Sequence, residues 1–161
     1  MTTKYATPAT GELFRYPPDQ LHRILVVDDD PYICQSNAEI LRRHGYVADT
    51  ATDGLAAWDS LQTNHYDLLV TDNDMPRMSG VQLLEKIHQA QLILPVIVAS
   101  GTMPVEALEH PEWHNLEALL PKPYSAVGLL ETVVNVLLQA YQEIGLPFVW
   151  QNQLPAGQMR L

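Results

Sequence analysis

Residues 24–30 read Ile24-Leu25-Val26-Val27-Asp28-Asp29-Asp30, so three aspartates directly follow an apolar run. Four consecutive apolar, mostly β-branched residues are typical of a short strand that is buried on both faces. The same pattern recurs along the chain, and a polar residue follows each run. These later runs are Leu68 to Thr71 before Asp72, Pro95 to Ala99 before Ser100, and Ala118 to Leu120 shortly before Lys122.

Helical segments are predicted between these strands. Asp30 followed by Pro31 is a typical N-cap and first-turn pair, and Gly45 is a typical stop. A further strand is expected over residues 47–51. Other helices are expected after Asp53-Gly54, after Ser79, over 104–110, and from Ser125 to about Tyr141, and the first helix is expected to bury a stripe of Ile33, Asn37, Ile40, Leu41 and His44.

Strand and helix therefore alternate five times. This order predicts an α/β fold, a doubly wound five-stranded parallel sheet with helices on both faces. The domain is expected to span residues 22–141. The proline-containing first 21 residues are predicted to be an arm, and residues 142–161 a tail too short to form an output domain, as in a stand-alone domain.

The composition excludes several classes of protein. The 161 residues include 9 Lys and Arg against 19 Asp and Glu, a net charge of −10, which argues against nucleic-acid binding. Cys34 is the single cysteine, so no internal disulfide can form. The sequence has neither an apolar run of membrane-spanning length nor a secretory signal, which predicts a cytoplasmic protein without membrane contact.

Polar residues follow four of the predicted strands: Asp28 and Asp29, then Asp72, Ser100 and Lys122. The carboxyl ends of parallel strands share one edge of the sheet, where ligands bind in such folds. Three carboxylates gathered there repel one another, and a hard cation such as Mg²⁺ would neutralise them. A carboxylate can also be a nucleophile that forms an aspartyl phosphate, with the metal, lysine and hydroxyl countering the phosphoryl charge.

These residues resemble the receiver domain of bacterial two-component response regulators over about residues 22–141. The resemblance rests on residues 24–30, 67–76 together with Gly80, 95–101, and Lys122-Pro123. It implies a flavodoxin-like fold with strand order 2-1-3-4-5. It also implies a signalling module in a phosphorelay, and not an enzyme, which receives a phosphoryl group from a sensor histidine kinase or a histidine phosphotransfer protein and signals to a downstream protein.

The resemblance also implies a role for each site residue. Asp72 is similar to the phosphoacceptor and, with Asp29, to a direct Mg²⁺ ligand, while Asp28 would act through water. The backbone carbonyl of Asp74 would be a further ligand. Ser100 is similar to the hydroxyl that bonds a phosphoryl oxygen, and Lys122 to the lysine that contacts the phosphoryl group and precedes a cis proline.

Two positions depart from the family pattern. Leu119 stands where an aromatic switch residue is common, and Asp74 places an acid two residues after the acceptor. We expect Asp74 to affect the lifetime of the phosphoryl group by repulsion or by placing water. Asp74→Asn should therefore change the dephosphorylation rate, and an unchanged rate would contradict this expectation.

Three alternatives remain open from the sequence. The pair Asp72 and Asp74 resembles the Asp-x-Asp motif of haloacid-dehalogenase-like phosphohydrolases, although that motif follows the first strand in those enzymes. A degenerate receiver could serve only as a binding scaffold. The last helix is apolar nearly all round, which favours either a homodimer or partner contact, or cover by the chain's own residues 148–150.

Overall fold

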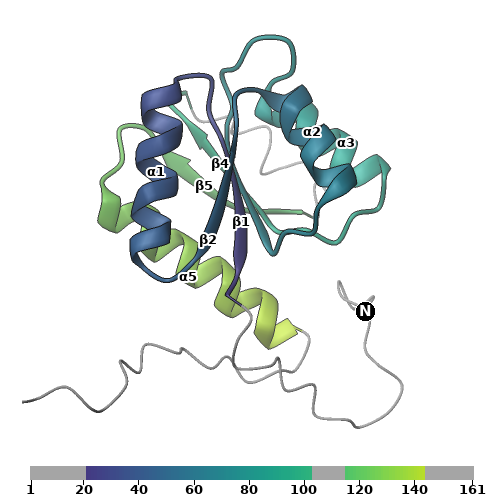
Figure 1. Cartoon of the computed structure of the whole chain (residues 1–161). Helices are drawn as coiled ribbons and strands as arrows, with labels where there is room; N and C mark the ends of the chain where they lie inside the picture. The colour runs from purple at the N-terminus through teal and green to yellow at the C-terminus, as the bar shows by residue number, and fades with distance from the viewer. Residues whose placement is uncertain (1–20, 103–114, 144–161) are drawn as a thin grey trace, which may run out of the picture.

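Five parallel strands form a single sheet in the order β2-β1-β3-β4-β5 in the computed structural model, which describes residues 21–102 and 115–143 (Figure 1). The fold class and strand order predicted above are confirmed. The strands are β1 (Arg23–Val27), β2 (Val47–Ala51), β3 (Leu68–Asp72), β4 (Val96–Ser100) and β5 (Leu116–Pro121).

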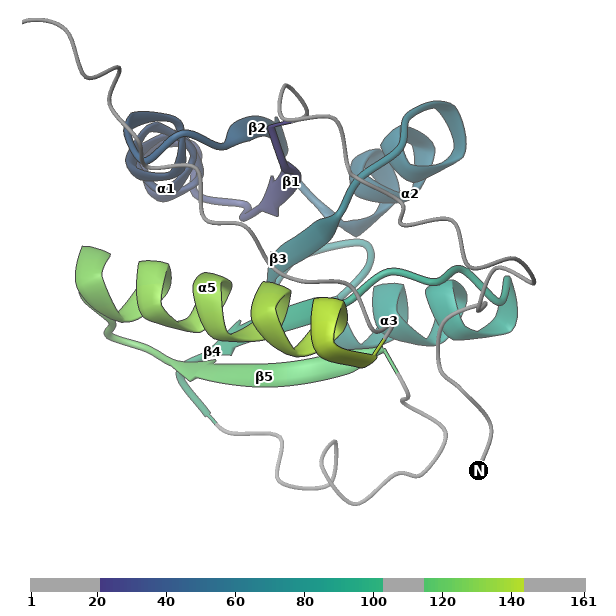
Figure 2. The ribbon, with the colours of Figure 1, turned by 90° about the horizontal axis from the view of Figure 1, so that it is seen from below.

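Helices cover both faces of the sheet. Figure 2 shows α1 and α5 on one face and α2 and α3 on the other. Their bounds are α1 (Pro31–Arg43), α2 (Gly54–Thr63), α3 (Gly80–Gln89) and α5 (Ala126–Glu143). Among these described helices, none combines the length and the apolar character that crossing a membrane requires.

The sheet separates two apolar cores. Every residue of β3 and β4 is buried, as expected for central strands of a parallel sheet with two covered faces. On one face, Leu41 of α1 and Leu129 of α5 pack against β1 and β3. On the other face, Ala57 of α2 and Leu84 of α3 pack against the same strands. This burial holds the strand ends in a fixed arrangement.

Side-chain caps start the helices where the sequence predicts. The carboxylate of Asp30 accepts hydrogen bonds from the amides of Tyr32 and Ile33, and Asp53 does the same for α2. Ser79 forms a capping box with Gln82 at the start of α3. These caps fix where each helix begins, close to the carboxyl edge of the sheet.

Asp53→Ala is expected to lower the free energy of unfolding by about 1–2 kcal/mol, the usual cost of losing a helix N-cap. The amide of Ala56, together with the nearby Arg77 guanidinium, holds the pKa of Asp53 below its usual value despite burial. The carboxylate therefore stabilises the fold above the unfolded-state pKa of about 4, and this contribution is lost as the pH falls through the lower folded-state pKa. Urea unfolding should show that the difference in free energy of unfolding between the wild type and Asp53→Ala becomes smaller below about pH 4. A difference that does not change with pH would contradict the contribution of the Asp53 charge.

Two local predictions need correction. Helix α1 buries Cys34, Asn37, Ala38 and Leu41, whereas the expected stripe placed Ile33 and His44 inward, and both are exposed. The helix is rotated toward its small residues, which allow a close approach to the sheet. Strand β5 is also longer than expected, and its register against β4 shifts between the Val96–Leu116 and Ile97–Ala118 pairs. Its half-buried residues do not form one continuous apolar run.

Other expectations lie outside the described residues. They concern the helix over 104–110, and residues 1–20 and 144–161 of the arm and tail.

The last helix extends to Glu143, slightly beyond the expected end. It buries Leu129, Val133, Val136 and Leu137 and leaves Val127 62% exposed.

Candidate functional site

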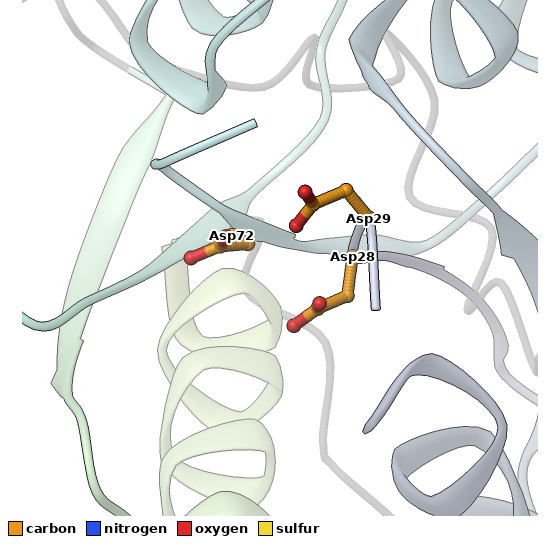
Figure 3. Close-up of side chains that lie close together, drawn as sticks. All are labelled: Asp28, Asp29 and Asp72. Atoms are coloured by element: carbon orange, nitrogen blue, oxygen red, sulfur yellow. The ribbon is translucent and has the colours of Figure 1, made fainter. Parts of the chain in front are cut away.

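Three aspartates converge at the carboxyl edge of the sheet. Asp28 and Asp29 follow β1, and Asp72 ends the neighbouring β3 (Figure 3). One carboxylate oxygen from each lies within 4.8 Å of the others. Asp28 and Asp72 are buried, whereas Asp29 is exposed. The structure therefore brings together the three carboxylates that the sequence assigned to the same edge.

Lys122 joins this cluster from the end of β5. Its Nζ lies 3.0 Å from Asp72 Oδ1 and 3.2 Å from Asp28 Oδ2. Burial alone would lower the pKa of Lys122, but the two carboxylates outweigh it and raise the pKa above the usual value. The amine is thus held as an ammonium ion between two buried carboxylates that stand 44 residues apart in the chain.

Both carboxylate oxygens of Asp28 accept hydrogen bonds. Oδ1 accepts a hydrogen bond from the amide of Asp30 at 2.9 Å, and Oδ2 faces Lys122. Burial raises the pKa of Asp28, and the Asp30 amide and the Lys122 charge oppose this rise. The side chain is therefore oriented by the Asp30 amide of its own loop and by Lys122 from the end of β5.

Ser100 and Asp74 lie nearby with different surroundings. Ser100 ends β4 next to Ala99, the residue that pairs with Asp72, and its buried hydroxyl donates a hydrogen bond to the carbonyl of Thr102 at 2.6 Å. Asp74 follows β3 with an exposed side chain that accepts a 3.3 Å hydrogen bond from Asn73. The Ser100 hydroxyl is thus turned toward its own loop in this conformation.

A polar contact that the sequence did not reveal supports the segment carrying Lys122. The Lys122-Pro123 bond is cis, as the resemblance implied. The next residue, Tyr124, accepts a hydrogen bond from the Asn37 side-chain amide at 2.9 Å. Asn37 was expected only as part of the buried stripe of α1, and no local signal links it to a residue 87 positions away.

The cluster fits a divalent cation. The three carboxylates carry three negative charges, and Lys122 offsets one, which leaves about two uncompensated. Asp72 Oδ1 is buried and accepts no hydrogen bond from residues 21–102 or 115–143, although the Lys122 ammonium lies beside it. Carboxylate oxygens with one exposed member suit Mg²⁺, which keeps several water ligands.

Gly80→Ala tests how tightly the acceptor strand is packed. A Cβ at Gly80 would lie 2.4 Å from the carbonyl oxygen of Asp72 and 3.0 Å from Asn73 Cα, both backbone atoms. Alanine is otherwise favoured over glycine in helices, so without the clash this substitution would stabilise the protein. The clash is expected to outweigh that gain and to make the substitution destabilising. We expect the free energy of unfolding to fall by about 1–3 kcal/mol.

Gly101→Ala provides a matched control for stability. A Cβ there meets no atom of the described residues within 4 Å. Its free energy of unfolding should stay within about 0.5 kcal/mol of the wild-type value. Urea unfolding measures the free energy of unfolding of both variants. If Gly80→Ala is as stable as Gly101→Ala, the proposed clash between a Cβ at residue 80 and the Asp72 backbone is contradicted.

Comparison with known proteins identifies similar domains. The sequence model of the response regulator receiver domain matches residues 24–134. Sensor histidine kinase RcsC of Escherichia coli K12 is 33% identical over 128 residues, which cover 80% of this chain but 13% of that protein. The match thus spans only a small part of this relative's length.

Solved structures show the same likeness. A CheY-like receiver domain protein from Methanospirillum hungatei is 29% identical with a TM-score of 0.70, covering 77% of this chain and 99% of that one. Response regulator TrrA of Thermotoga maritima, solved in complex with Mg²⁺ and BeF, is 28% identical with a TM-score of 0.64. That match covers 72% of this chain and 99% of that one.

Proposed function

Because the chain belongs to the response regulator receiver domain family, we propose that it accepts a phosphoryl group on Asp72 in the presence of Mg²⁺. The observation that carries the proposal is the cluster itself. Asp28, Asp29 and Asp72 offer oxygens within 4.8 Å of one another, and Lys122 contacts two of them. The donor would be a sensor histidine kinase or a histidine phosphotransfer protein.

In the proposed transfer, a carboxylate oxygen of Asp72 attacks the phosphorus of a phosphohistidine. A new P–O bond forms as the P–N bond breaks, and the departing imidazole takes up a proton. Asp28, Asp29, Asp72 and the carbonyl of Asp74 are the proposed metal-site groups, with Asp28 acting through water. Mg²⁺, when bound, would neutralise charge on the phosphoryl oxygens.

Lys122 and Ser100 would then hold the transferred group. Lys122 is already 3.0 Å from Asp72, so its ammonium can contact a phosphoryl oxygen after a small movement. The Ser100 hydroxyl would have to leave the Thr102 carbonyl and rotate toward Asp72. That rotation is the proposed start of a shift between two conformations that a downstream protein reads.

The relatives support the proposed partners. RcsC is named a sensor histidine kinase, and the matched segment is only a small part of it. TrrA was solved with Mg²⁺ and BeF, which supports the proposal that this chain binds Mg²⁺. The downstream protein, a homodimer through α5 and a cytoplasmic location are further proposals, and the exposed Val127 is the observation that favours a contact at α5.

Incubation with acetyl phosphate, with and without Mg²⁺, tests the function directly. Attack by Asp72 releases acetate and should add one phosphoryl group, seen by intact mass spectrometry as a base-labile adduct. The adduct should not form when EDTA removes Mg²⁺ before acetyl phosphate is added. A folded wild-type protein that gains no mass would contradict the proposal and favour the alternative of a degenerate receiver that serves as a binding scaffold.

A further inference from the structure

The loop between β3 and α3, residues 73–79, directly follows the proposed acceptor. Its two ends are held together, because the carbonyl of Asn73 accepts hydrogen bonds from the amides of Met75 and Gly80, each at 3.1 Å. The Asn73 side chain also accepts a bond from the amide of Val81 at 3.2 Å. These bonds close the base of the loop but leave its tip to be held by other contacts.

The tip of the loop is strained at Arg77. Its φ of 67° lies in the left-handed region, which is unfavourable for a residue with a side chain. A single non-glycine residue keeps such a conformation when its surroundings over-determine it. The contacts of Arg77 therefore show what holds the loop in shape.

Arg77 is held by a buried carboxylate on another loop. Its guanidinium forms an ion pair with Oδ2 of Asp53, which is 1% exposed. The other oxygen, Oδ1, accepts the amides of Leu55 and Ala56 at 2.9 and 3.0 Å. One carboxylate thus starts helix α2 and anchors the tip of the loop that follows Asp72.

The start of α2 also packs tightly against the loop next to this ion pair, at Gly54 and Met78. A Cβ at Gly54 would lie 2.7 Å from both Cγ and the carbonyl oxygen of Met78. Met78 is itself buried. The start of α2 therefore contacts the loop at two adjacent points, the Asp53–Arg77 ion pair and the Gly54–Met78 contact.

We propose that Asp53 and Arg77 are a positioning pair that holds loop 73–79 in the shape that Mg²⁺ binding and phosphoryl transfer require. This inference rests on the proposed function. Neither residue belongs to the carboxylate cluster, and neither is assigned contact with the phosphoryl group. They act through the loop, which carries the Asp74 carbonyl and directly follows Asp72 at the end of β3.

Charge alone and positioning predict opposite results for Arg77→Ala. Loss of a cation makes the surroundings of the site more negative, which by itself would strengthen Mg²⁺ binding. If Arg77 positions the loop, its loss should instead raise the half-saturating Mg²⁺ concentration by about tenfold, the usual scale for groups that orient a metal's ligands. The maximal phosphorylation rate at saturating Mg²⁺ should change less.

Half-saturating Mg²⁺ should be measured in two ways. One is the Mg²⁺ dependence of phosphorylation by acetyl phosphate, and the other is the Mg²⁺-dependent rise in Tm, which needs no phosphoryl transfer. Arg77→Gly fits the positive φ without strain and should weaken Mg²⁺ binding although it folds easily. Arg77→Lys keeps the charge and should recover part of the affinity.

Asp53→Asn tests the other partner, since asparagine is as good an N-cap as aspartate and keeps the start of α2. Asp53→Asn should also weaken Mg²⁺ binding. If the two residues act as a pair, the double variant with Arg77→Ala should have the same half-saturating Mg²⁺ concentration as the more strongly affected single variant, or a lower one. Arg43→Ala is the matched control. It removes the same charge from an exposed Arg43–Glu39 ion pair on α1 and should leave the half-saturating concentration unchanged.

The outcomes separate this inference from the proposed function. Arg77→Ala and Asp53→Asn proteins that lose stability but bind Mg²⁺ as the wild type does would overturn the positioning role. Additive effects in the double variant would overturn the pairing. A wild-type protein that binds Mg²⁺ but gains no phosphoryl group would overturn the proposed function alone, while one whose Tm does not respond to Mg²⁺ would overturn both.

Discussion

Asp72→Asn is expected to abolish phosphoryl uptake from acetyl phosphate. The amide has nearly the shape of the carboxylate but lacks its nucleophilic charge, so the P–O bond of the adduct cannot form. Asp28 and Asp29 remain in place, but Asp28 is held by Lys122 and the Asp30 amide. We therefore expect intact mass spectrometry to detect no base-labile adduct in this variant.

The same substitution should leave the fold intact. It removes one of three mutually repelling carboxylates, and Lys122 keeps Asp28 as its partner at 3.2 Å. The Mg²⁺-dependent rise in Tm should shrink because the site loses one charged ligand. Asp59→Asn on the exposed side of α2 is the matched control and should take up the phosphoryl group normally. Phosphorylation of Asp72→Asn at the wild-type level would place the acceptor on another residue.

Lys122→Met is expected to change phosphoryl transfer and Mg²⁺ binding in opposite directions. The ammonium lies against two buried carboxylates, and its loss leaves about three uncompensated charges where there were two. Removing one donor that stabilises phosphoryl charge should slow transfer by about 100-fold or more. The extra negative charge should strengthen Mg²⁺ binding.

Stability should follow the same charges. Without Mg²⁺, the free energy of unfolding should fall by about 1–3 kcal/mol, less than for a fully buried pair because Lys122 is 26% exposed. Added Mg²⁺ should raise the Tm of this variant more than that of the wild type. Lys86→Met on α3 removes a lysine that lies over the Trp58 ring and controls for overall charge. A Lys122→Met protein that is phosphorylated at nearly the wild-type rate would contradict the proposed role of Lys122.

Much of the fold could be predicted because its signals are local. A run such as residues 24–27 is apolar whatever surrounds it, and a carboxylate at Asp30 or Asp53 caps the helix that begins one residue later. The gathering of Asp28, Asp29 and Asp72 at one edge then followed from the parallel sheet. The resemblance to receivers supplied the strand order, which the structure confirms.

The orientation of elements was predicted less well. The pattern on α1 favoured Ile33, yet the helix turns Cys34 and Ala38 inward because small residues let it approach the sheet. Tyr124 and Asn37 meet across 87 positions, and Arg77 and Asp53 across 24. Such pairs depend on how two elements pack, and no spacing within one element reveals them.

The sequence by itself determined the strands, the helix starts and the gathering of acids at one edge, because runs, caps and strand ends depend on neighbours along the chain. Only the tertiary structure decided that Lys122 lies between Asp28 and Asp72, and that the Ser100 hydroxyl turns to Thr102. It also decided that Asp53 holds the loop tip at Arg77. These contacts join separate loops, and their geometry is set by the packing of helices on the sheet that brings those loops together.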